Sequence, residues 1–129
     1  MAAPFLVALV EAGHEIALVV TGEDRRRGRR EEPSPSPVKA AATDLGLPVA
    51  HDMRTLVDCG ADLGVVVAFG ALIPTRILDV LPMVNVHFSS LPRWRGPAPV
   101  EWAVRSGDTT TGVCVMGVGE DFDIGGIHA

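Results

Sequence analysis

The stretch LGVVVAFGALIPTRILDVLPMVNVHF, residues 63–88, decides the fold. Residues 63–69 form a nearly unbroken apolar run rich in valine, which predicts a strand covered on both faces. Residues 74–80 show helical spacing, with Pro74 at the expected first turn. Residues 84–88 are a second short β-branched run. A strand, a helix and another strand in this order predict a parallel βαβ unit.

The same alternation extends along the rest of the chain. At the N-terminal end, Phe5, Leu6, Leu9 and Val10 recur at helical spacing and Gly13 follows as a stop signal. The other predicted elements are strands over residues 15–20, 48–51 and 110–116 and helices over residues 38–45, 55–59 and 99–105. This alternation predicts an α/β fold with a doubly wound, mostly parallel, Rossmann-like sheet, and the length suits one domain over residues 1–129.

Composition narrows the classes of protein. Of the 129 residues, 47% are hydrophobic and only 5% aromatic, so the core is expected to be aliphatic. The net charge of −5 argues against coating nucleic acid with the whole surface, although it permits a local basic patch. Cys59 and Cys114 lack the spacing of metal ligands, which favours reduced cysteines, a cytoplasmic protein and no metal site. Neither a membrane-spanning apolar run nor a signal-peptide pattern is expected.

Polar residues with catalytic potential follow the second strand of the βαβ unit. Asn85 and His87 are two residues apart, so on a strand they share one face, at the end where open α/β sheets bind ligands. Asp123 stands before two glycines after the last predicted strand. An amide, an imidazole and a carboxylate suit acyl transfer to an amine. The alternatives are structural roles for Asn85 and His87, and a solvated loop acid for Asp123, as we expect for Glu120 and Asp121.

The segment Asn-Val-His-Phe-Ser-Ser-Leu-Pro-Arg-Trp-Arg-Gly, residues 85–96, closely resembles the N-x-H-x-S-L-L-P-R-[WY]-R-G signature of folate-dependent formyltransferases. Ser90 replaces the usual leucine. The resemblance implies the formyltransferase fold and a catalytic set of Asn85, His87 and Asp123. It also implies that 10-formyltetrahydrofolate is the formyl donor. The donor site implied by the resemblance comprises Phe69, Gly70, Ser89, Ser90, Leu91 and Pro92.

A basic segment indicates the branch of this family. The segment contains Arg25, Arg26, Arg27, Arg29 and Arg30, and Pro-Ser-Pro-Val-Lys follows at residues 35–39. It is similar to the tRNA-contacting insert of methionyl-tRNA formyltransferases. The resemblance implies transfer of a formyl group to the α-amine of methionyl initiator tRNA, for translation initiation, by a cytoplasmic monomer. The alternative for the arginines is a solvated loop, and Glu31-Glu32 departs from the basic or apolar residues usual there.

Two other functions remain open at this point. One is formyl transfer to an amino-sugar nucleotide, which uses the same Asn, His and Asp residue types. The other is a truncated, inactive remnant, because the resemblance places Met1 inside the helix that follows the family's first strand and Ala129 before its C-terminal β-barrel domain. A missing central strand would leave two half-sheets with unpaired inner edges. We therefore expect residues 1–129 to be a partial catalytic domain.

Overall fold

The computed structural model describes residues 1–26, 28, 32–121 and 125–129. Arg27, Arg29, Arg30 and Asp123, which the sequence marks as candidate site residues, lie outside these ranges. The chain divides into two compact units, Met1–Ala61 and Asp62–Ala129. Each unit is described separately below.

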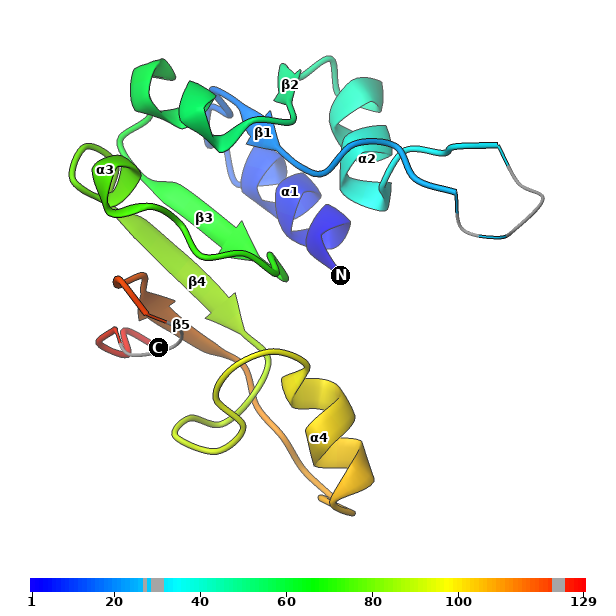
Figure 1. The fold of residues 1–129 in the computed structure, drawn as a ribbon, viewed down its shortest axis with the longest axis vertical. Helices are drawn as coiled ribbons and strands as arrows, with labels where there is room; N and C mark the ends of the chain where they lie inside the picture. The colour runs from blue at the N-terminus through cyan, green and yellow to red at the C-terminus, as the bar shows by residue number, and fades with distance from the viewer. Residues whose placement is uncertain (27, 29–31, 122–124) are drawn as a thin grey trace. The chain divides into compact units, whose positions relative to one another are not determined.

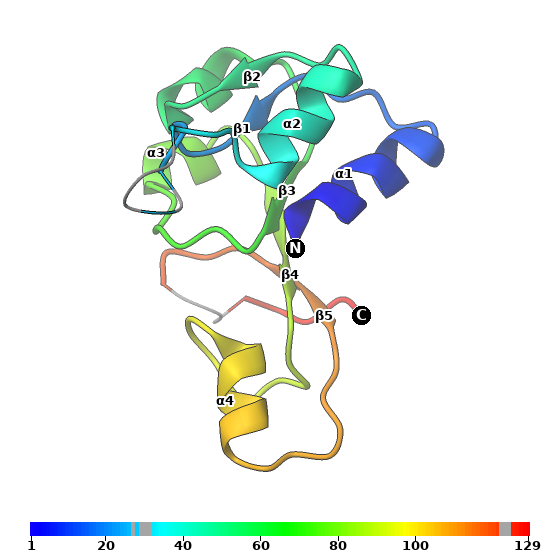
Figure 2. The same cartoon turned by 90° about the vertical axis from the view of Figure 1, so that its right-hand side faces the viewer.

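The first unit packs two helices against a short parallel sheet (Figure 2). Its elements are α1 (Ala2–Glu11), β1 (Val19–Val20), α2 (Pro37–Asp44), β2 (Val49–Ala50) and the 3₁₀ helix η1 (Met53–Asp58). Leu6, Val19 and Ala42, one residue from each of α1, β1 and α2, form the buried core. The predicted helices are confirmed, whereas the strand expected over residues 15–20 is ordered as a strand only at β1, where β2 supplies partners.

The second unit is built on a three-stranded sheet in the order β3 (Gly64–Val67), β4 (Met83–His87), β5 (Cys114–Gly117). The strands β3 and β4 are parallel and are joined by α3 (Thr75–Leu78), which confirms the βαβ unit. The helix α4 (Pro99–Arg105) lies beyond the carboxyl end of β4 (Figure 1). The chain leaving α4 re-enters the sheet from that same end, so β5 runs antiparallel to β4. The sheet of the second unit is therefore mixed, with one parallel pair, β3–β4, and one antiparallel pair, β4–β5.

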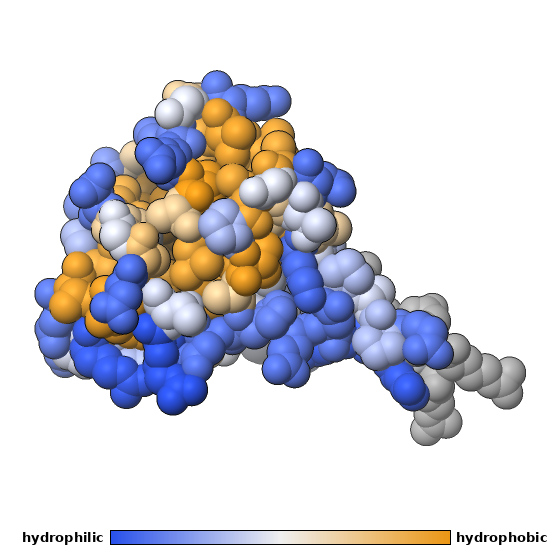
Figure 3. All heavy atoms as spheres, turned by 90° about the horizontal axis from the view of Figure 1, so that it is seen from above, coloured by the Kyte–Doolittle hydropathy of each residue, from blue (hydrophilic) through white to orange (hydrophobic). Residues whose placement is uncertain are grey.

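Aliphatic side chains form the core of the second unit, as the composition predicts. Ile77 from α3 and Met116 from β5 are the most buried large residues, and Leu81 and Val86 are also buried. The expectation that β3 is covered on both faces is wrong, because Val65 remains 40% exposed. Figure 3 shows apolar side chains that are exposed between polar ones. Large exposed hydrophobic residues of the second unit include Leu63, Leu72 and Val80.

The described residues contain two separate sheets, β1–β2 and β3–β4–β5, with no hydrogen-bonded ladder joining them. This arrangement matches the prediction of two half-sheets. Among the described residues, β1 pairs only with β2 and β3 pairs only with β4, so each sheet ends at a strand that is paired on one side.

Candidate active site

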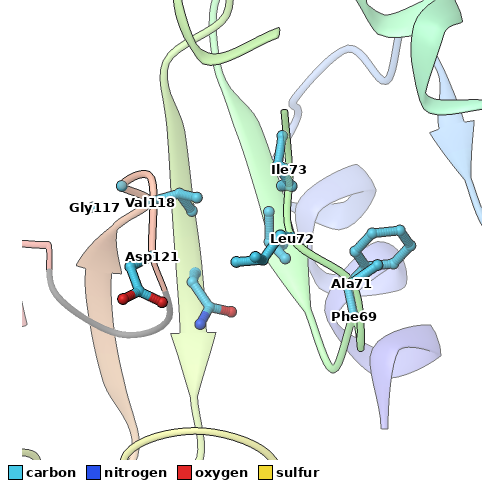
Figure 4. A pocket seen from close by; sticks show the side chains of 10 residues that line it. Phe69, Ala71, Leu72, Ile73, Gly117, Val118 and Asp121 are labelled. Atoms are coloured by element: carbon cyan, nitrogen blue, oxygen red, sulfur yellow. The ribbon is translucent and has the colours of Figure 1, made fainter. Parts of the chain in front are cut away.

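Asn85 lies in the wall of a pocket within the second unit. The strand β4 places Asn85 between Val66 of β3 and Met116 of β5, with which it is in register. The pocket is formed by the end of β3, the segment after it, β4, and the segment that follows β5 (Figure 4). Its lining residues are Val66, Phe69, Ala71, Leu72, Ile73, Asn85, Gly117, Val118, Gly119 and Asp121.

The pocket combines apolar walls with few polar groups, which is the usual composition of a small-molecule site. Leu72 and Phe69 line one side, and Val118 and Asp121 line the other (Figure 4). Within this lining, the carboxamide of Asn85 and the carboxylate of Asp121 are the polar side chains. An apolar ring could therefore lie between the walls while a carbonyl oxygen accepts a hydrogen bond from the Asn85 amide.

His87 lies two residues beyond Asn85 on the same face of β4, and its side chain is buried, with 5% exposed. Its Nε2 is 2.9 Å from the backbone oxygen of Trp94. A carbonyl oxygen only accepts hydrogen bonds, so Nε2 carries the hydrogen and donates it. This hydrogen bond ties the imidazole of His87 to the backbone of the loop that follows β4. His87 is not part of the pocket lining; it marks the carboxyl end of the strand that carries Asn85.

The loop after β4 is held by its own polar contacts. Ser89 is fully buried, and its Oγ donates to the backbone oxygen of Arg93 at 2.6 Å. The Arg93 guanidinium and the Trp94 indole N–H both donate to the carboxylate of Asp108, just after α4. Hydrogen bonds from Arg93 and then Trp94 lower the pKa of Asp108 from 3.8 to about 2. This carboxylate is therefore ionised throughout the neutral range.

The predicted folate-binding residues fall into two groups. Phe69 lines the pocket and Gly70 follows it directly in the chain. Ser89, Ser90, Leu91 and Pro92 belong to the loop after β4 and do not line this pocket. A folate-binding role for these six residues stays a prediction, as does a catalytic role for Asp123, which lies outside the described residues.

Sequence reasoning missed Asp108 and the pocket role of Asp121. The contact of Asp108 with Arg93 spans 15 residues, so no local pattern reveals it. Asp121 was expected to be a solvated acid; it is exposed, yet it also lines the pocket with Asn85. Its position two residues before Asp123 was the available signal.

In the first unit, hydrogen bonds fix the base of the segment that carries the arginines, residues 21–36, which we call the arginine loop. Thr21 Oγ1 and Ser36 Oγ are 3.0 Å apart where the loop begins and ends. Further along, Arg25 and Ser34 exchange two backbone hydrogen bonds. Arg25 and Arg26 are both exposed. The described parts of the loop are thus paired with each other by hydrogen bonds, and they expose the side chains of Arg25 and Arg26.

The described part of the chain contains no group of three or more His, Cys, Asp or Glu side chains arranged to hold a metal ion. Cys59 and Cys114 are free cysteines. A search of the described residues for a helix long and apolar enough to cross a membrane finds none.

Comparison with solved structures defines the class of fold. A phosphoribosylglycinamide formyltransferase from Bacillus halodurans superposes with a TM-score of 0.78 and 23% identity, covering 98% of this chain and 71% of that one. A glycinamide ribonucleotide transformylase from Geobacillus kaustophilus gives a TM-score of 0.77 at 24% identity, over 99% of this chain and 74% of that one. The fold is therefore the formyltransferase fold.

Sequence comparison gives the family. The pattern of the family described as "Formyl transferase" matches residues 2–129, so the chain belongs to this family. A methionyl-tRNA formyltransferase from Heliobacterium modesticaldum is 50% identical over 96% of this chain and 42% of its own length. Another from Roseobacter denitrificans is 45% identical over 98% of this chain and 45% of its own length. The resemblance to this branch is confirmed, and the chain spans less than half the length of these relatives.

Proposed function

We propose that the protein transfers a formyl group from 10-formyltetrahydrofolate to the α-amine of methionine on initiator tRNA. The observation that carries the proposal is the strand β4, which sets the Asn85 amide in an apolar pocket and His87 just beyond it. In this proposal residues 1–129 are part of the catalytic domain of a cytoplasmic, monomeric enzyme of translation initiation. The similarity to methionyl-tRNA formyltransferases supports methionyl-tRNA as the acceptor in this proposal. Membership of the formyl transferase family supports formyl transfer as the reaction.

Asn85 is proposed to hold the formyl oxygen. The α-amine nitrogen attacks the formyl carbon, and the carbonyl π electrons move onto that oxygen. The Asn85 N–H donates to the resulting oxyanion, which is worth roughly 10²–10³ in rate for one donor of this kind. The bond between the formyl carbon and the folate nitrogen then breaks, and that nitrogen takes a proton.

His87 is proposed to stabilise the oxyanion and to relay a proton. The amine must lose a proton as the new C–N bond forms, and the imidazole of His87 is the proposed relay for that proton. The Nε2–H of His87 donates to the Trp94 carbonyl, which holds the ring in place. Asp123 is proposed to orient His87 and to assist proton removal through water. The imidazolium that forms on proton uptake is the species that a neighbouring carboxylate stabilises.

The donor is proposed to bind in the pocket, with its ring system against Phe69 and Leu72. The apolar walls suit a flat heterocycle, and the carboxylate of Asp121 offers an acceptor for ring N–H groups. Gly70 and the loop residues Ser89, Ser90, Leu91 and Pro92 complete the proposed folate site.

The arginine loop is proposed to contact tRNA phosphates through Arg25, Arg26, Arg27, Arg29 and Arg30. Substituting Arg25 and Arg26 by alanine should raise KM for the tRNA and reduce the salt slope of binding by roughly 1–2 units, because about 0.7–0.9 unit is lost per phosphate contact. Arg76→Ala, an exposed cation on α3, is the matched control and should leave the slope unchanged. An unchanged slope in the double variant would contradict the tRNA contact.

The acceptor is tested by competition. The full-length protein is incubated with labelled 10-formyltetrahydrofolate, methionyl initiator tRNA and an amino-sugar nucleotide together, and the labelled product is identified. Label on the methionine α-amine supports the proposal. Label on the sugar amine would replace it with the amino-sugar function, and label on neither acceptor would favour the inactive remnant.

A further inference from the structure

Three side chains from two separate segments converge at the carboxyl end of β4. We call Arg93, Trp94 and Asp108 the brace. Asp108 Oδ2 accepts from Arg93 Nε at 2.9 Å and from Trp94 Nε1 at 2.7 Å, while its Oδ1 accepts from Arg93 Nη2 at 2.7 Å. One carboxylate therefore holds two consecutive residues of the loop through three charge-assisted hydrogen bonds, which are stronger than neutral ones.

The end of α4 fixes the backbone of Asp108. Gly107 has a φ of 73°, the left-handed conformation that ends many helices. The Gly107 N–H donates to the Val104 oxygen at 3.1 Å, and the Asp108 N–H donates to the Ala103 oxygen at 3.0 Å. This is the Schellman pattern, and Ala103 is itself buried, with 4% exposed. The acceptor of the brace thus rests on a regular helix terminus.

Trp94, one of the two residues that donate to Asp108, has an unfavourable backbone conformation. Trp94 has a φ of 60°, a left-handed conformation that is unfavourable for a residue with a bulky side chain and persists only where its surroundings hold it. Its backbone oxygen accepts from His87 Nε2 at 2.9 Å. Its ring stacks on Trp102 of α4 with centroids 6.3 Å apart, and the guanidinium carbon of Arg93 lies over the Trp94 ring, 4.3 Å from its centroid. Side-chain contacts therefore maintain the backbone conformation that meets His87.

We propose that Asp108 is a positioning residue for His87: by bonding Arg93 and Trp94 it holds the Trp94 carbonyl against Nε2. This contact fixes the orientation of the imidazole and keeps the hydrogen on Nε2, because a carbonyl oxygen only accepts. Asp108 itself does not line the pocket. The catalytic consequence rests on the proposed function, whereas the effect on the His87 ring does not.

The first test observes the His87 ring directly. Nitrogen-15 and proton NMR of the full-length protein should show a slowly exchanging Nε2–H of His87 and a neutral form protonated at Nε2. In Asp108→Asn a single carboxamide oxygen replaces the two carboxylate oxygens. The side chain can then no longer accept all three hydrogen bonds from Arg93 and Trp94. We expect exchange of the Nε2–H to become at least about tenfold faster and the Nδ1–H tautomer to appear. Glu101→Gln, the same chemical change at an exposed position on α4, should change neither.

The second test separates positioning from simple stabilisation. In the formyl-transfer assay Asp108→Asn should lower kcat by about tenfold or more while KM for the tRNA changes less than about twofold, since a misplaced catalytic group affects the chemical step. A normal His87 ring spectrum in Asp108→Asn would overturn the proposal, even if the melting temperature falls. If the wild-type protein shows no transfer, the ring spectrum alone decides.

A second, more conservative variant tests the proposal in case Asp108→Asn fails to fold. Trp94→Phe keeps an aromatic ring beside Trp102 and leaves Arg93 and Asp108 in place, while it removes the indole N–H that bonds Asp108. We expect a smaller acceleration of Nε2–H exchange, about threefold, in a folded protein. No change in this variant together with no change in Asp108→Asn would refute the brace as a positioning device.

Discussion

Gly125 makes a close approach that only glycine permits, and its substitution should disable the pocket. A Cβ on Gly125 would lie 2.5 Å from the carbonyl carbon of Gly117, 3.1 Å from its Cα and closer still to its oxygen. Comfortable carbon–carbon contacts are about 3.5–4.0 Å, so the two backbone segments must separate by about 1 Å. The obstructing atoms are backbone, which has no rotamer to relieve the clash.

Gly117 belongs to both β5 and the pocket, so this separation is transmitted to the site. It pairs with Val84 of β4, and its N–H donates to the Gly126 oxygen at 2.9 Å. A displacement of about 1 Å near reacting groups can cost about 10²-fold, or about 2.7 kcal/mol in the activation barrier. We therefore expect Gly125→Ala to lower kcat/KM for formyl transfer by about 10²-fold.

The assay is steady-state formylation of methionyl initiator tRNA, accompanied by a thermal melt to establish that the variant is folded. Gly126→Ala is the matched control, because a Cβ at that glycine meets nothing within 4 Å. The control should retain activity within about threefold. If Gly125→Ala and Gly126→Ala lose activity equally, the argument from close approach is refuted.

Three further outcomes follow from particular contacts. The pKa of Asp108 is about 2 in the folded protein, compared with its ordinary value of 3.8. The stability that this carboxylate contributes is therefore complete above pH 3.8 and is lost as the pH falls toward 2. Acid titration followed by circular dichroism should show a shallower loss of stability over that range for Asp108→Asn than for the wild type. Ile77→Ala removes a fully buried side chain and should cost about 2–5 kcal/mol in urea unfolding, whereas Val80→Ala, at a position 56% exposed, should cost under about 0.5 kcal/mol; equal costs would contradict the assigned core. Ser36→Ala removes the cap of α2 and should cost about 1 kcal/mol, whereas Ser34→Ala, which bonds Arg25 only through its backbone, should be nearly neutral in the same unfolding experiment.

Local signals predicted some elements to the residue. The helix α4 spans Pro99–Arg105 as predicted, because Pro99 suits a first helical position and Gly107 supplies the left-handed residue after the end. The position of Asn85 was predicted by the same kind of reasoning, because the alternation of side chains along a strand determines which residues share a face. The structure places Asn85 in the wall of the pocket. Helix propensity, proline and glycine signals and strand alternation act over a few residues. For α4 and for the position of Asn85 these local signals were sufficient.

Features that depend on distant partners could not be predicted. The strand expected over residues 15–20 is limited to Val19–Val20, because a parallel strand extends only as far as its partner β2. The antiparallel direction of β5 depends on where the chain re-enters the sheet after α4. The brace joins residues 93 and 94 to residue 108 across a helix, and the Trp94 carbonyl reaches His87 only because Trp94 adopts a left-handed backbone. These contacts arise from tertiary packing, which no short pattern encodes.

The central claim is that Asn85 and His87 of β4 carry the chemistry of formyl transfer. Its most direct test is single-turnover transfer from labelled 10-formyltetrahydrofolate to methionyl initiator tRNA by the full-length protein, with saturating substrates, for the wild type, Asn85→Ala, His87→Ala and the exposed control His14→Ala. The account predicts losses of at least about 10²-fold for Asn85→Ala and His87→Ala and no loss for His14→Ala. Rates for Asn85→Ala and His87→Ala close to the wild-type rate would contradict it.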